Sequence, residues 1–93
     1  MSGQVALSDA ALPRVLVVDD TRTHEVFDVI GLVDDVVRAR SAFLFEIGEQ
    51  LRVRVVSDGS VFEATARVRA HVGPDDARIT ELELVERSEP RKA

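Results

Sequence analysis

The chain contains no cysteine, and this absence excludes several classes of protein at once. A disulfide scaffold, a zinc ribbon and a thiol nucleophile all require cysteine. Long apolar runs are also missing, so no segment of the sequence could cross a bilayer. The N-terminus lacks the basic start and the apolar stretch of a signal peptide. We therefore expect a cytoplasmic protein with no membrane insertion.

Aromatic side chains are scarce too, at 4% of 93 residues, whereas 45% of the residues are hydrophobic and valine is prominent among them. Such a composition favours β-structure in a single small domain. A domain of this size buries only roughly 60–65% of its unfolded surface, so a partner or self-association would add to its stability. The formal net charge of −5 argues against nucleic acid as a partner, because phosphate binding needs a basic face.

The strongest local signal is Asp58-Gly59, which lies between two stretches of alternating polarity. This dipeptide is typical of a two-residue β-hairpin turn. The resulting register places apolar residues opposite one another on one face and opposite charges on the other. It pairs Val55 with Phe62, Val53 with Ala64, Leu51 with Ala66 and Arg54 with Glu63.

A second turn at residues 73–77 contains glycine, proline and aspartate, and it predicts a third antiparallel strand. Pairing Val72 with Arg78 aligns three opposite-charge pairs on the outer face. Each pair contributes only ~0.2–1 kcal/mol, so their main effect is to fix the register. The expected pairs are Arg67 with Glu83, Arg69 with Glu81 and Glu63 with Arg87, and Ala70 is expected opposite Thr80.

The first half of the chain predicts further strands. Residues 14–18 form a β-branched run that is closed by a turn at residues 19–21. Residues 25–29 and 32–40 predict two strands with a bend or bulge near Gly31, with Val37 and Ala39 pointing inward. Residues 41–47 predict an apolar crossover in which Phe43 or Phe45 fills the core.

These segments predict an all-β domain, a small antiparallel barrel of six strands, because closure of a sheet removes its exposed edges. The barrel is expected to span residues 14–87. A flexible arm is expected at residues 1–13 and a disordered tail at residues 88–93.

The run VVRARSAFLFEIGEQLRVRVVSDGSVFEATARV at residues 36–68, followed by ELELVE at residues 81–86, resembles a PilZ domain. The shared pattern is a strand with an arginine-serine end, an apolar linker, a glycine turn, two long strands and a closing strand. The resemblance implies a six-stranded barrel. In many PilZ domains, cyclic di-GMP is bound by an Arg-x-x-x-Arg element and an Asp/Asn-x-Ser-x-x-Gly element.

Both nucleotide-binding elements are altered in this chain. Arg14 and Arg22 are each followed four places later by a valine, Val18 and Val26. The second element falls on Gly31, Val33 and Val36, or on Asp28, Ile30 and Val33 when it is shifted. Branched side chains would then lie where the nucleotide should bind. The resemblance thus implies a PilZ-like domain without cyclic di-GMP and without another cofactor.

Catalytic and metal-binding patterns are weak. His24 and His71 are far apart, no serine has a histidine nearby in the sequence, and the paired aspartates fall at expected turns. We therefore expect no enzymatic activity, no catalytic residues and no metal site.

Two surfaces could instead bind a partner protein. One is an outward basic stripe made by Arg38 and Arg40 with Arg52 and Arg54, if their strands are neighbours. The other is an apolar patch at Val33 and Val36, near Val29. The resemblance implies a protein-interaction module that regulates motility, type IV pili or surface behaviour. The alternatives are a cyclic di-GMP receptor with an atypical site and a structural or oligomerising scaffold.

Overall fold

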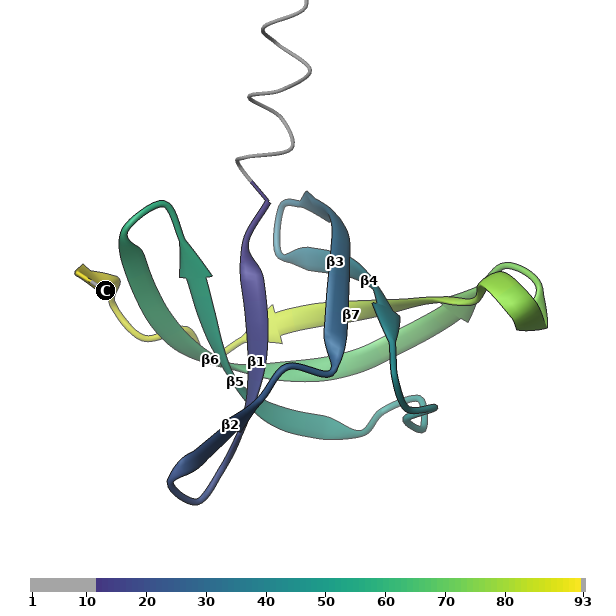
Figure 1. The fold of residues 1–93 in the computed structure, drawn as a ribbon, viewed down its shortest axis with the longest axis horizontal. Coiled ribbons are helices and arrows are strands. Elements are labelled where there is room, and N and C mark those ends of the chain that lie inside the picture. Colours follow the sequence, from purple (N-terminus) through teal and green to yellow (C-terminus); the bar gives the residue numbers. More distant parts are fainter. Residues whose placement is uncertain (1–11, 93) are drawn as a thin grey trace, which may run out of the picture.

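The structure, a computed structural model, describes residues 12–92. It holds one antiparallel sheet with the strand order β2-β1-β5-β6-β7-β4-β3, and the short β8 pairs with β6 beside it (Figure 1). A single-turn 3₁₀ helix, η1 (Asp75–Ala77), precedes β7. The strands are β1 (Arg14–Asp19), β2 (Arg22–His24), β3 (Phe27–Val33), β4 (Val36–Ser41), β5 (Gln50–Ser57), β6 (Ser60–Val72), β7 (Ile79–Val85) and β8 (Arg91–Lys92).

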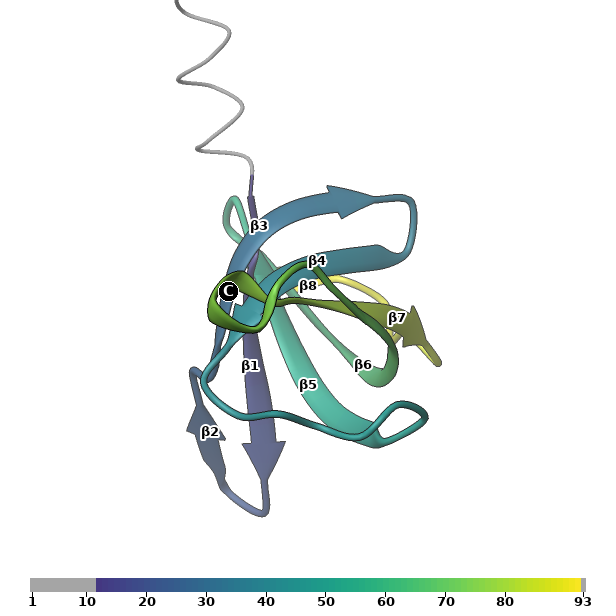
Figure 2. The same cartoon turned by 90° about the vertical axis from the view of Figure 1, so that its right-hand side faces the viewer.

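The sheet curls strongly, so that β3 at one end of the strand order comes into contact with β1 near the other end (Figure 2). An ion pair joins Arg14 of β1 to Glu25, which lies in the connection that leads from β2 into β3. No backbone ladder joins β3 to β1 within residues 12–92, so the sheet is not closed by hydrogen bonds. The predicted antiparallel all-β fold is confirmed, but the sheet has more strands than the six expected and remains open between β1 and β3.

The β5–β6 hairpin has the predicted register along its whole length. Val55 lies opposite Phe62 and Arg54 lies opposite Glu63. The turn residues Asp58 and Gly59 have φ values of 51° and 82°. Positive φ at both positions matches the right-handed twist of the flanking strands, which explains why this dipeptide sets the register.

The β6–β7 pairing follows the prediction only as far as Val68. Arg67 lies opposite Glu83, but the register then shifts between Val68 and Ala70. This β-bulge adds Arg69 as an extra residue to β6, so Ala70 lies opposite Glu81 rather than Thr80. The backbone pairing predicted beyond residue 68 is therefore wrong by one residue. The expected ion pair of Arg69 with Glu81 is nevertheless present, with 4.0 Å between the Arg69 Nε and a Glu81 carboxylate oxygen.

In the β3–β4 hairpin, Gly31 lies at a bulge, as predicted, but the chain reverses later, at Asp34 and Asp35. Asp34 has φ 55°, a left-handed conformation that aspartate tolerates better than most residues. Val37 and Ala39 are fully buried, as expected for the inward face of β4.

The chain after β7 runs along an edge of β6 that β7 leaves uncovered. β6 has 13 residues and β7 has 7, so the first part of β6 has no partner from β7. Lys92 of β8 pairs with Ser60, and the Ser88 backbone NH donates to the Glu63 carbonyl over 2.7 Å. Glu63 accepts from Arg54 and Arg91, whereas its predicted partner Arg87 bonds Asp35. Residues 91 and 92, which belong to the segment expected to be a disordered tail, form the two-residue strand β8.

The core lies inside the curl of the sheet and is built from small and β-branched side chains. Phe45 of the β4–β5 connection packs against it. The buried members are Val15, Phe27, Val37, Ala39, Val53, Val55, Ala64, Ala66, Val68, Leu82 and Leu84. No helix in the described part of the chain is long and apolar enough to cross a membrane.

Candidate functional site

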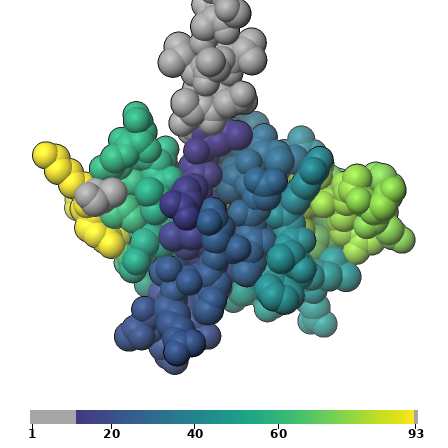
Figure 3. Space-filling model, viewed as in Figure 1, coloured from purple at the N-terminus to yellow at the C-terminus, as the bar shows by residue number. Residues whose placement is uncertain are grey.

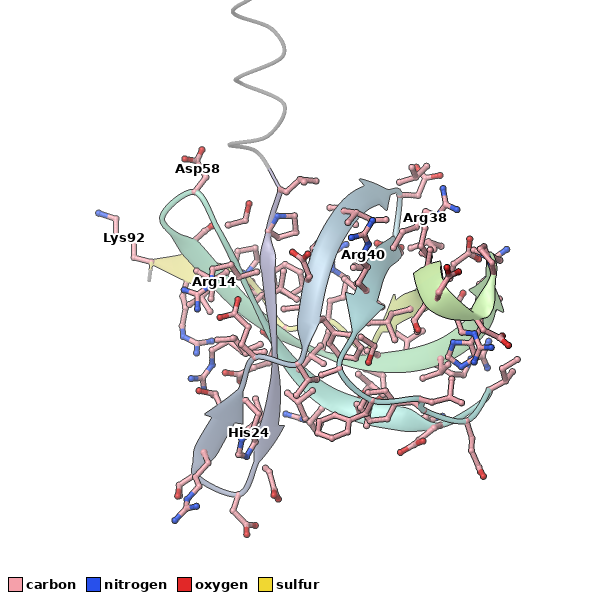
Figure 4. The ribbon with its side chains drawn as sticks, turned by 45° about the vertical axis from the view of Figure 1, so that its right-hand side comes forward. Arg14, His24, Arg38, Arg40, Asp58 and Lys92 are labelled. Atoms are coloured by element: carbon pink, nitrogen blue, oxygen red, sulfur yellow. The ribbon has the colours of Figure 1, made fainter. Side chains whose placement is uncertain are left out.

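The basic stripe predicted from the sequence is not formed. Two strands, β6 and β7, separate β5 from β4 in the sheet, so Arg52 and Arg54 lie far from Arg38 and Arg40. Arg38 and Arg40 project from β4 (Figure 4). The Arg38 Nε lies 3.5 Å from a Glu81 carboxylate oxygen, and Arg54 bonds Glu63 at 3.0 Å. Arg38 and Arg54 thus form cross-strand ion pairs, and the four arginines do not gather on one surface.

The structure does bring Val33 and Val36 together. They lie opposite one another where the β3–β4 hairpin turns, with Val33 65% exposed and Val36 half-buried. Ile30 and Leu32 are also exposed on β3. This end of the hairpin therefore exposes apolar side chains, whereas Val29 packs against the core, and the binding role expected for Val33 and Val36 stays a prediction.

A second apolar surface lies on the connection between β4 and β5, residues 42–49, here called the apolar loop. Phe43, Leu44 and Ile47 are 61%, 66% and 66% exposed. Phe45 turns the other way and packs against the Phe27 ring, with 5.6 Å between the centroids. The expected core-filling role thus belongs to Phe45, and Phe43 lies outside the core.

Backbone hydrogen bonds hold the apolar loop to the sheet at both ends. The Ala42 NH donates to the Val26 carbonyl over 2.9 Å, and the Gly48 NH donates to the Val68 carbonyl over 2.7 Å. The Val68 NH in turn donates to the Glu49 carbonyl over 2.9 Å. Gly48 has φ 92°, which favours glycine at this turn. The loop therefore has a defined conformation although its large side chains face outward.

His71 adds a side-chain anchor in the middle of the loop. Its Nε2 lies 2.6 Å from the Phe45 carbonyl oxygen and its Nδ1 lies 3.0 Å from Thr80 Oγ1. Because a carbonyl only accepts, Nε2 carries the proton, and Nδ1 accepts from the threonine hydroxyl in the neutral ring. With Ala66 and Val68 facing inward, strict alternation along β6 would leave His71 on the outer face. The bulge at Arg69 turns it toward the buried Thr80, and nothing in the local sequence signals that change.

An open groove of about 880 Å³ lies beside the apolar loop, next to the β1–β2 hairpin that projects from the body in Figure 3. The loop, the hairpin and the start of β5 supply its lining. The apolar lining residues are Val17, Val18, Val26, Phe43, Phe45 and Leu51, and the polar ones are Asp19, Thr23, His24, Glu25, Gln50 and Arg52.

The charges around this surface are mostly negative. Glu25 accepts two hydrogen bonds from Arg14, which lower the pKa of the Glu25 carboxyl and raise the pKa of the Arg14 guanidinium. Asp19 in the groove lining, and Glu46 and Glu49 in the loop, form no ion pair within residues 12–92. Glu49 instead accepts from the Glu46 backbone NH over 3.0 Å.

Across residues 12–92, no three histidine, aspartate or glutamate side chains gather closely enough to hold a metal ion. The chain matches no protein-family model, no curated protein and no solved structure. The geometry of the apolar loop and its groove therefore carries the functional argument.

Proposed function

We propose that this domain is a PilZ-like interaction module that binds another protein through the apolar loop and has no catalytic activity. The observation that carries this proposal is the exposure of Phe43, Leu44 and Ile47 on a loop held by backbone hydrogen bonds. Large side chains displayed on an ordered backbone bind with little loss of conformational entropy, and apolar anchors beside a groove are typical of interface hot spots.

The PilZ-like part of the proposal concerns the architecture and the biological role. The curl that brings β3 against β1 is compatible with a barrel that is open along one side. The role we propose, from the resemblance, is regulation of bacterial motility, type IV pili or surface behaviour in the cytoplasm.

The surroundings of Arg14 and Val33 support a domain that does not bind cyclic di-GMP. The Arg14 guanidinium is already engaged by Glu25, at 2.9 Å between Nη2 and Oε1. Val33, at a position where the PilZ element has a serine or glycine, exposes a branched side chain. Calorimetric titration with cyclic di-GMP should show no binding, and micromolar affinity would replace this proposal with that of a nucleotide receptor.

The test of docking is co-purification from the native host with three forms of the full chain. The wild type and Val33→Ser should retain the same partner, and the double variant Leu44→Ser/Ile47→Ser should lose it. Val33 is a matched control because it is 65% exposed, against 66% for Leu44. Loss of the partner with Val33→Ser alone would assign docking to the β3–β4 hairpin. A stable homo-oligomer that binds no other protein would favour the scaffold alternative.

A further inference from the structure

We propose that the apolar loop and its groove dock a protein segment in which apolar side chains are flanked by lysine or arginine. This inference rests on the proposed docking function and adds the chemistry of the partner. The partner segment should carry apolar side chains because the groove lining is apolar. In that lining, Val17, Val26 and Leu51 lie next to the exposed Phe43. At about 880 Å³ and open to solvent, the groove has the size of a ligand pocket and can receive several side chains at once.

The partner segment should carry basic residues because several carboxylates around the groove form no ion pair within residues 12–92. Asp19, Glu46 and Glu49 carry three negative charges that no arginine or lysine neutralises within residues 12–92. Arg52 is the one arginine in the groove lining, and the Arg14–Glu25 pair has no net charge. A surface with excess negative charge attracts cationic segments and repels acidic ones.

The excess negative charge around the loop disfavours two other occupants. A second copy of this chain carries a net charge of −5, so self-docking would bring like charges together around the loop. An anionic lipid surface would be repelled by Glu46 and Glu49 beside the inserted side chains. A cationic amphipathic segment fits both the apolar and the charged parts of the site.

The chain has no tryptophan or tyrosine, so a probe peptide with one tryptophan reports binding by its own fluorescence. We would use a synthetic peptide of about 14 residues, near four helical turns, with leucines and the tryptophan flanked by lysines. Two matched peptides isolate the two requirements. In one, every lysine is replaced by glutamate, and in the other, every leucine is replaced by serine.

The lysine peptide should bind the full chain at least about tenfold more tightly than either matched peptide. Phe43→Ser changes the groove lining itself, and Leu44→Ser/Ile47→Ser changes the exposed part of the loop outside that lining. Each variant should weaken this binding by about tenfold or more, because fewer apolar side chains enter the interface. Val33→Ser should leave it unchanged. Asp19→Asn/Glu46→Gln should weaken it by about two- to tenfold, since each exposed ion pair contributes little. Added salt should weaken the wild type more than this neutralised variant.

Equal binding of the lysine and glutamate peptides would overturn the inference, as would equal losses from Val33→Ser and the loop double variant. Sedimentation that shows a dimer converted to a monomer by Leu44→Ser/Ile47→Ser would assign the surface to a second copy. Loop-dependent flotation with phosphatidylcholine vesicles would assign it to lipid. If the co-purified partner still depends on Leu44 while the peptides bind equally, the docking function stands and only the partner chemistry is wrong.

Discussion

His71→Ala is the substitution that most directly tests how the apolar loop is held. The change removes both ring contacts, the 2.6 Å bond to the Phe45 carbonyl and the 3.0 Å bond to Thr80 Oγ1. A typical intramolecular hydrogen bond contributes a net ~0.5–1.5 kcal/mol. Thr80 is only 2% exposed, so its hydroxyl would also lose a partner that water cannot easily replace. We expect a loss of about 1–3 kcal/mol in the free energy of unfolding.

That loss would be a large fraction of the total, because a domain of this length is expected to have only ~5–14 kcal/mol of stability. Urea unfolding followed by far-UV circular dichroism measures it, since the chain lacks tryptophan and tyrosine as intrinsic reporters. With a slope of ~1–3 kcal/mol per molar urea, the midpoint should fall by about 1 M. His24→Ala is the matched control, because the His24 side chain is exposed and forms no hydrogen bond within residues 12–92. Its effect should stay below ~0.5 kcal/mol.

Limited digestion with chymotrypsin gives the local readout. In His71→Ala, cleavage at Phe43, Leu44 or Phe45 should become faster than in the wild type, because loop segments released from their anchors are preferred proteolytic sites. Unchanged cleavage together with a stability equal to that of His24→Ala would refute the reasoning. It would mean that the backbone bonds at the two ends of the loop suffice to hold it.

The other predictions concern the outer face of the sheet and its turns. Hydrogen bonds from Arg91 and Arg54 lower the pKa of the Glu63 carboxyl in the folded protein. The ionised carboxylate therefore stabilises the fold at pH values above its unfolded pKa. This contribution is lost as the pH falls through the lower pKa of the folded state. The stability difference between wild type and Glu63→Gln should therefore be present at pH 7 and vanish in strong acid, as measured by urea unfolding across pH. A difference that persists unchanged in acid would contradict this. Gly59→Ala should destabilise the protein by ~1 kcal/mol or more, because Gly59 has a φ of 82°. Gly31→Ala should be neutral or slightly stabilising, because the Gly31 backbone has no positive φ and open space surrounds the position of the added Cβ. Equal thermal shifts for the two glycine variants would contradict the turn assignment.

The parts of the fold that were predicted correctly are those specified by short-range chemistry. Asp58-Gly59 sets a turn and a register by itself, and alternation then places Val53 and Val55 in the core. The bulge at Arg69 could not be predicted in the same way. It lies just beyond Arg67, the last residue of β6 that pairs with β5, and no local residue pattern marks where that pairing ends.

The candidate site depended still more on tertiary context. The sequence Phe43-Leu44-Phe45 has the same composition whether it fills the core or faces solvent, and only the packing of Phe45 on Phe27 shows which ring turns inward. The basic stripe was predicted on the condition that two strands are neighbours. Strand order arises from long-range pairing, and here it separates Arg38 from Arg52 by two strands.

In the apolar loop, the atoms that hold the loop in place differ from the side chains proposed to contact a partner. The effect of a substitution on binding can therefore be separated from its effect on stability. Backbone groups of residues 42, 48 and 49, together with the Phe45 carbonyl, hold the loop in place. The side chains of Leu44 and Ile47 remain two-thirds exposed and add little to the core. Replacing them with serine should therefore change stability by no more than ~0.5 kcal/mol while removing the anchors for a partner. Because these side chains are little buried in the folded domain, a partner that covers them would add apolar burial that the fold itself does not supply.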